Sequence, residues 1–236
     1  MKRIGLLVVV LAFILCSANI ALAADGPRAV KSGNICILTD NSGVPTNVKL
    51  DLNPQVQLPR SVLRSNVNVV MKCHVDETWQ DEYGSSMWAE IGSIVDDAEY
   101  GILNSFGISF SPVGVATILP EPSNSNSFLS TISSQSHYYN NNGTAAYADM
   151  IVGFTAITDG QIAGRTYLNQ PYSVILDRGS RNGESLQHEI GHMYGLARTA
   201  DGHCPNDCVM TASGWGHIND FCNSCATYWS ANANKY

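Results

Sequence analysis

The sequence predicts an α+β domain in which helices cover a mixed, twisted β-sheet, followed by a small irregular C-terminal part. Apolar and polar residues alternate over residues 67–75, and residues 150–158 are mostly apolar. Both patterns are typical of β-strands. Residues 76–106 and 184–194 instead repeat apolar residues at helical spacing, which gives two main helices. The chain has 236 residues and is 44% hydrophobic, enough to bury one core of ordinary size.

The N-terminus has the pattern of a secretory signal peptide over residues 1–23. A positively charged start precedes an apolar run over residues 4–15, and Ala21-Leu22-Ala23 follows with the small residues that a signal peptidase needs. The run is too short for a comfortable transmembrane span. We therefore expect export, a secreted or periplasmic location, and no membrane association after cleavage.

Removing residues 1–23 would remove Lys2 and Arg3 but no acidic residue. The formal net charge would change from −7 to −9, that is, 11 basic against 20 acidic residues. Such an acidic chain repels phosphate backbones, so we expect no nucleic-acid partner. Residues 24–65 are rich in Gly, Pro, Asn and Ser and are expected to be an irregular segment or a propeptide. Residues 66–236 would then form the catalytic domain, acting as a monomer.

The first half of that domain reads as strand, helix and strand. The long helix is expected to begin at residue 76 and to end at Gly107, because glycine readily adopts the left-handed conformation that closes a helix. Residues 108–119 are β-rich but interrupted by Pro112. A polar stretch follows over residues 120–143, with a short helix expected at 128–133.

The second half begins with an expected hairpin. Residues 150–158 and 162–168 flank an Asp-Gly turn, so we predict that they pair, with 162–168 at the edge of the sheet. An edge strand could bind a peptide by strand addition. A further strand is expected at 172–176 and a helix at 184–194 that ends at Gly195. The remainder should be mostly loop.

The expected helix at 184–194 contains His188, Glu189 and His192. Histidines four residues apart lie on one helix face, about 5–6 Å apart, and can bind one zinc ion. Glu189 would project beside the metal, where its carboxylate could take a proton from water and pass it to a leaving amine. The pattern predicts hydrolysis of peptide bonds in peptide or protein substrates.

Catalytic zinc usually has three protein ligands, so a further ligand is expected downstream. The candidates are Asp201, His203, Asp207, His217 and Asp220. No glutamate follows Glu189, which argues against a thermolysin-like site. Arg198, six residues after His192, is cationic and cannot bind zinc.

Four features follow the first two histidines in this order: Gly195, His203-Cys204, Cys208-Val209-Met210 and Cys222-Asn223-Ser224-Cys225. This order resembles that of the metzincin family, and most closely that of its archaemetzincin branch. This chain has five additional residues before the third histidine, and its cysteine spacings are shorter. The resemblance covers residues 188–225. It implies a metzincin-like fold, His203 as the third zinc ligand, and Met210 in a tight turn beneath the zinc.

The resemblance also implies a second, structural zinc bound by four cysteines: Cys204, Cys208, Cys222 and Cys225. An exported protein meets an oxidising environment, which favours two disulfides among them instead. Either arrangement would hold the loop that carries His203. Cys36 and Cys73 are expected to form a further disulfide. A latency switch in which Cys36 binds the catalytic zinc would leave Cys73 without a partner.

The function predicted is that of an exported zinc endopeptidase with Glu189 as general base. One alternative is an aspzincin-like peptidase, in which Asp201, preceded by Thr199, replaces His203. Another is a pseudo-peptidase that binds zinc and peptides without cleaving them, and a third is an exported metal-binding protein.

Overall fold

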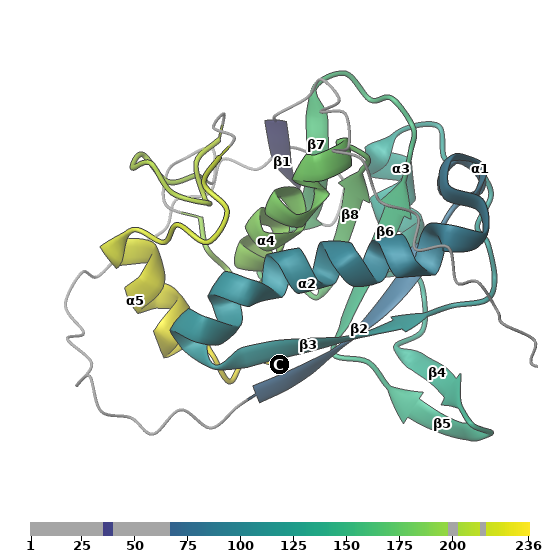
Figure 1. Ribbon diagram of the computed structural model, residues 1–236, viewed down its shortest axis with the longest axis horizontal. Helices are drawn as coiled ribbons and strands as arrows, with labels where there is room; N and C mark the ends of the chain where they lie inside the picture. The colour runs from purple at the N-terminus through teal and green to yellow at the C-terminus, as the bar shows by residue number, and fades with distance from the viewer. Residues whose placement is uncertain (1–34, 40–66, 198–202, 213–215) are drawn as a thin grey trace, which may run out of the picture.

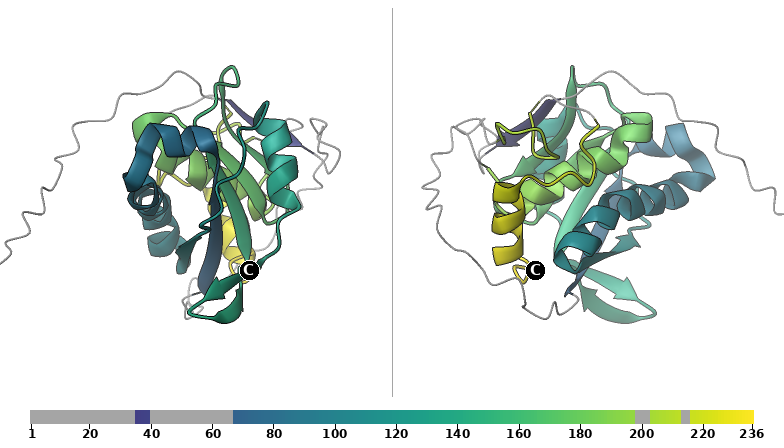
Figure 2. Two further views of the ribbon diagram at one scale, coloured as in Figure 1. Left: turned by 90° about the vertical axis from the view of Figure 1, so that its right-hand side faces the viewer. Right: turned by 60° about the vertical axis from the view of Figure 1, so that its left-hand side comes forward.

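The computed structural model describes residues 35–39, 67–197, 203–212 and 216–236. It confirms the α+β class. One face of the main sheet is covered by two long helices and the other face by a shorter helix, so the sheet forms the middle layer (Figures 1 and 2). The signal peptide and most of residues 24–65 lie outside the described residues.

The main sheet has six strands. They are β1 (Ile35–Thr39), β2 (Val67–Val75), β3 (Ile108–Gly114), β6 (Met150–Thr155), β7 (Ile162–Tyr167) and β8 (Tyr172–Leu176). Their order across the sheet is β1-β7-β8-β6-β2-β3. The pairs β2–β3, β2–β6, β6–β8 and β1–β7 are parallel, whereas β7–β8 is antiparallel. Pro112 is tolerated in β3 because β3 is an edge strand in the described sheet.

The helices are α1 (Glu77–Tyr83), η1 (Gly84–Ser86), α2 (Met87–Phe106), α3 (Ser125–Ser133), η2 (Gly179–Arg181), α4 (Asn182–Met193) and α5 (Asn223–Ala231). Helices α2 and α4 pack against each other on one face of the sheet, and α3 packs on β6, β7 and β8 from the other face. A separate hairpin pairs β4 (Tyr138–Asn141) with β5 (Thr144–Tyr147). It projects from the domain at the end opposite α3 (Figure 1).

The single helix expected over residues 76–106 is divided. Asp76 begins α1 by accepting a hydrogen bond from the Trp79 backbone N–H, at 2.9 Å. Gly84 then adopts a φ of 51°, which a continuous helix cannot contain, and α2 starts three residues later. The expected stop is correct, because Gly107 closes α2 with a φ of 70°.

The expected hairpin between residues 150–158 and 162–168 is wrong. Strand β8 lies between β6 and β7, so β7 forms its hairpin with β8 instead. A turn joins these two strands, in which Gln170 N–H donates to the Tyr167 carbonyl and Asn169 has a left-handed φ of 63°. Asn tolerates the left-handed conformation. Pro171 has no backbone N–H, so it cannot donate a hydrogen bond to a neighbouring strand and does not extend β7.

The edge expected at β7 is also occupied. Residues 35–39, from the segment expected to be irregular, form β1 and pair along β7. This arrangement rules out the expected disulfide between Cys36 and Cys73. Cys36 is on β1 and Cys73 on β2, four inter-strand steps apart, or roughly 19 Å at about 4.8 Å per step. A disulfide requires Cα atoms within about 7 Å.

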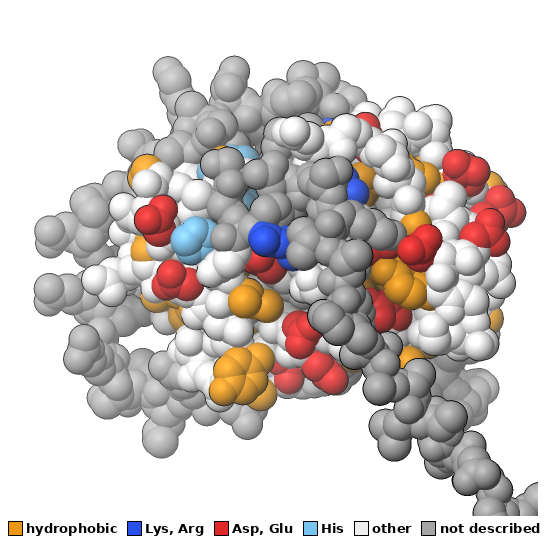
Figure 3. Space-filling model, turned by 45° about the horizontal axis from the view of Figure 1, so that its top comes forward, with side chains coloured by type: hydrophobic (Ala, Val, Ile, Leu, Met, Phe, Trp, Pro, Cys, Tyr) orange, Lys and Arg blue, Asp and Glu red, His pale blue; other side chains and the backbone are white. Residues whose placement is uncertain are grey.

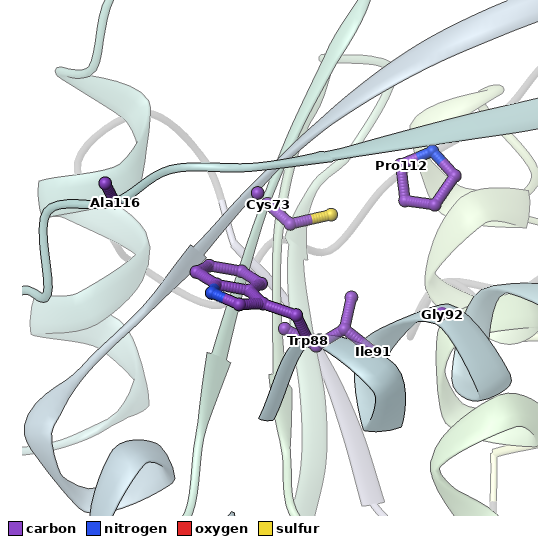
Figure 4. Close-up of a pocket in the computed structure, with 7 residues that line it drawn as sticks. Cys73, Trp88, Ile91, Gly92, Pro112 and Ala116 are labelled. Carbon is purple, nitrogen blue, oxygen red and sulfur yellow. The ribbon is translucent and has the colours of Figure 1, made fainter. Parts of the chain in front are cut away.

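Cys73 is instead a free, buried thiol. Burial raises its pKa to about 12, so it stays protonated. It lines a mostly apolar cavity of about 380 Å³, with Trp88 and Ile91 on the α2 side and Pro112 on β3. Figure 4 shows Cys73 on the sheet side of this cavity, facing the helix.

The C-terminal part contains one helix that the sequence pattern did not predict. In α5, Trp229 is fully buried and stacks on Phe106, with ring centroids 5.2 Å apart. This contact joins the end of α2 to the C-terminal part and extends the main core under the cysteines. No helix in the described ranges is long and apolar enough to cross a membrane.

Candidate active site

Helix α4 carries the motif and is buried over its whole length. Asp177, at the end of β8, accepts hydrogen bonds from the Gly179 backbone N–H and the Asn182 side-chain amide. The Asn182 side-chain oxygen in turn accepts from the Arg178 backbone N–H. These bonds fix the start of α4 against the sheet, so the helix enters the site at a defined position.

The middle of α4 is anchored to its neighbours by Gln187. Its amide donates to the Ala98 carbonyl on α2 at 2.7 Å and to the Asn219 side-chain oxygen at 2.8 Å. Its own oxygen accepts from the Asn219 backbone N–H. Gln187 therefore ties the helix to both α2 and the C-terminal part, immediately before His188.

The structure brings His188, His192 and His203 together. One ring nitrogen of each lies within 4.8 Å of the others, and all three side chains are buried. No other histidine of the described residues joins this group. His217, a weaker candidate ligand, instead faces Asp220, with 3.8 Å between ring nitrogen and carboxylate oxygen. Asp201 lies outside the described residues.

Two of the histidines have defined orientations. The Nδ1 of His188 bonds to the Val209 carbonyl at 2.5 Å, and the Nδ1 of His192 bonds to the Leu196 carbonyl at 2.6 Å. A carbonyl can only accept, so each Nδ1 carries the proton and each Nε2 presents a lone pair. Burial, followed by the neighbouring histidines, lowers the pKa of His188 to about 3 and that of His192 well below its usual value, so both rings are neutral.

These two neutral rings fit a metal ion. Their Nε2 atoms are 2.9 Å apart, so two lone pairs converge in a buried space. Such an arrangement is repulsive unless a cation lies between the atoms. Two nitrogens on one tetrahedral zinc at 2.0–2.1 Å would be roughly 3.3 Å apart, close to the observed spacing. The backbone carbonyls that fix the tautomers are the kind of partner that usually orients metal-binding histidines.

Gly195 explains how His192 obtains its carbonyl partner. Its φ of 95° turns the chain at the end of α4, and Leu196 N–H then donates back to the Gly191 carbonyl. This turn directs the Leu196 carbonyl at His192. A side chain at position 195 would also meet Asn169 and the Tyr228 hydroxyl, within 2.9 Å.

Glu189 is 1% exposed and lies against β7. The Thr166 hydroxyl donates to its Oε2 at 2.5 Å. On the other side, a Cβ added to Gly164 would be 2.3 Å from its Oε1, so only glycine leaves room for the carboxylate there. The sequence patterns did not identify Gly164 or Thr166, since their positions depend on the unpredicted β7–β8 pairing.

Met210 lies directly beneath α4. It is 1% exposed, and a Cβ added to Gly191 would be 2.3 Å from its sulfur. Its carbonyl accepts from the Cys204 N–H at 2.7 Å, which fixes the residue after His203. Met210 thus links the helix with the first two histidines to the segment with the third.

The four late cysteines form a second cluster. Their sulfur atoms lie within 4.8 Å of one another. Cys204 and Cys222 are 3.5 Å apart and Cys208 and Cys225 are 4.0 Å apart, much longer than a disulfide bond of about 2.05 Å. In the structure these four cysteines are free and form no disulfide. Four sulfurs at about 2.3 Å from one zinc would be roughly 3.8 Å apart, which fits this spacing.

The model of peptidase family M54 matches residues 164–231. The M54 match starts at Gly164, beside Glu189, and ends with α5, so it contains both the histidine and the cysteine clusters. It supports a zinc-dependent peptidase for this part of the chain, in agreement with the donor groups of the site. A search of curated proteins finds no match.

One solved structure similar to this chain is entitled "Structure of a chaperone-substrate complex". It shares 15% identity with a TM-score of 0.50, over 72% of this chain and 34% of that one. The likeness concerns the fold alone, and this chain spans about a third of that chain's length.

On the face shown in Figure 3, acidic side chains are numerous and basic ones are few.

Proposed function

We propose that this chain is an exported zinc endopeptidase with Glu189 as its general base. The proposal rests on one observation above all: two neutral imidazole Nε2 atoms converge at 2.9 Å, and they belong to the helix that carries the buried Glu189. His188, His192 and His203 would hold the metal. A zinc ion there would supply Lewis acidity toward water and the scissile carbonyl.

The protein side of the reaction is proton transfer by Glu189. Its carboxylate would take a proton from the attacking water and pass it to the amine that leaves. The Thr166 hydroxyl donates to Oε2 and thereby holds the carboxylate in one orientation. Burial keeps bulk water away from this exchange, which strengthens the electrostatic interactions within the site.

Metal removal tests the proposal. Hydrolysis of a mixture of fluorogenic random-sequence peptides should disappear with a chelator and return on addition of zinc. The Nε2 spacing supports metal binding, but a protein could bind the metal without catalysing hydrolysis. The absence of cleavage would therefore be an informative result. A protein that binds zinc at the histidines and cleaves none of the peptides would be a pseudo-peptidase or a metal-binding protein.

We further propose that the four cysteines hold a structural zinc. The hydrogen bond between Cys208 and Cys225 lowers the pKa of Cys208, which favours the thiolate form that zinc binds. Val209 and Met210 follow Cys208 directly, and the Val209 carbonyl orients His188. A zinc bound here would thereby stabilise both the Met210 turn and the loop that carries His203.

Thr166→Val should lower kcat by about 10- to 100-fold, because a carboxylate that is misplaced by about 1 Å transfers protons poorly. KM and zinc content should not change, since Thr166 contacts the base alone in this site. Thr166→Ser keeps the hydroxyl and should retain most activity. Ser173→Ala is the matched control, because it removes the other hydroxyl bonded to Thr166, at 2.9 Å, and leaves the Thr166 hydroxyl that donates to Glu189. Equal kcat for the Val and Ser variants would contradict a positioning role for Thr166.

A further inference from the structure

Strand β1 occupies the side of β7 that would otherwise be the edge of the sheet. It runs parallel to β7, with Cys36 opposite Gly164 and Leu38 opposite Thr166. In sequence, β1 lies far before the rest of the sheet, yet the views agree that it lies beside β7 (Figures 1 and 2). The N-terminal segment therefore returns to the catalytic half of the domain.

Two of the β7 residues that pair with β1 also contact Glu189, the proposed general base. Gly164 lies against Glu189 Oε1, and Thr166 donates to Oε2. Without β1, the free backbone N–H and C=O groups of β7 would border this carboxylate. An extended peptide could add to such an edge by main-chain hydrogen bonds, which would place its backbone next to the base.

We propose that residues 35–39 are an intramolecular competitor for peptide substrate, which keeps the enzyme in a state of low activity until β1 leaves β7. This inference rests on the proposed peptidase function. A peptide and β1 need the same backbone groups of β7, so they cannot bind together. The apparent affinity for substrate is then reduced by the fraction of molecules in which β7 is free.

The pairing of β1 is suited to release. Parallel pairing is slightly less stable per residue than antiparallel pairing. The register also shifts between Ile35 and Cys36, which disturbs the ladder near its start. Strand β1 has five residues and borders one partner only in the described sheet. Cleavage of the chain around β1, or a substrate that pairs antiparallel with β7, could therefore displace it.

A double variant of the full chain, Ile37→Pro/Leu38→Pro, tests the competition. Successive backbone N–H groups of a strand point to opposite sides, so one of two adjacent prolines must remove a donor that faces β7. Ile37→Ala/Leu38→Ala is the matched control, because it truncates the same two side chains but keeps both N–H groups. Cys36→Ser tests separately whether the thiol contributes.

Two measurements are needed. Hydrogen exchange at the amides of residues 162–167 should be faster in the proline variant than in the alanine variant, and added peptide mixture should slow it again. The proline variant should also cleave the peptide mixture with kcat/KM raised at least about tenfold over the alanine variant, the change expected if β7 is free in a tenth of wild-type molecules or fewer. Cys36→Ser should behave as the wild type does.

The outcomes separate this inference from the proposed function. If peptides protect the β7 amides in the proline variant but no variant cleaves them, β1 competes for the edge and the peptidase proposal fails. If the proline and alanine variants cleave equally, the competition is wrong and the peptidase proposal stands. Activation by Cys36→Ser alone, with unchanged exchange at β7, would also contradict a competition based on backbone pairing.

Discussion

His203→Ala is expected to lose the catalytic zinc and essentially all peptide hydrolysis. His203 is the one member of the histidine group that does not come from α4, and its ring nitrogens lie within 4.8 Å of those of His188 and His192. Loss of an outer partner of a zinc ligand usually costs 10- to 100-fold in metal affinity or activity, so loss of a ligand should cost more than about 100-fold. Metal analysis of the purified variant should show one zinc fewer per chain.

Asp201→Ala is the control for this result, since Asp201 is the alternative third ligand of an aspzincin-like site. It should keep its zinc and most of its activity. If His203→Ala retains zinc and activity while Asp201→Ala loses both, the assignment of His203 is wrong. Circular dichroism of both variants would show whether either loss reflects unfolding.

Glu189→Gln should lower kcat by about 10²- to 10⁴-fold, the contribution usual for a general acid–base group, while the zinc content stays unchanged. The amide has nearly the same shape as the carboxylate and can still accept from the Thr166 hydroxyl, so the packing against Gly164 is preserved. It cannot take a proton from water. Single-turnover kinetics with the peptide mixture would measure the loss.

Activity within about tenfold of the wild type would contradict the role of Glu189. In that case another group would have to accept the proton. Loss of zinc together with activity would also contradict it, because Glu189 would then act on the metal site instead of on the proton transfer.

The sequence patterns located the main elements because each carries its own signal. Strand β2 alternates, α2 has an apolar stripe that includes Ile91, Ile94 and Ala98, and α4 ends where Gly195 predicts. Local chemistry was sufficient in these cases. It also placed His188 and His192 on one face of a helix, whereas the assignment of His203 to the same group followed from the resemblance to the metzincin family.

The pairing of the strands could not be predicted in the same way. The Asp159-Gly160 turn favoured a hairpin between β6 and β7, but β8 inserts between them. Which strand lies beside β7 depends on contacts between distant segments, such as α4 on β7 and β8. The positions of Gly164 and Thr166 beside Glu189, and the pairing of β1, follow from this order and were therefore missed.

The cysteines show how a compartment argument can mislead. Expected export favoured disulfides, including one between Cys36 and Cys73. The strand order separates these two residues, and the spacing of the late cysteines is that of ligands instead of bonded sulfurs. Coordination by a zinc ion would protect four thiolates from pairing in an oxidising environment, so this geometry is compatible with the proposed export.

Anomalous diffraction at the zinc absorption edge, from crystals of the zinc-loaded protein, tests the central claim most directly. We predict one strong peak at about 2.0–2.1 Å from a nitrogen of each of His188, His192 and His203, and a second among the sulfurs of Cys204, Cys208, Cys222 and Cys225. Absence of a peak at the histidines, or a peak there bound by Asp201 in place of His203, would contradict the account.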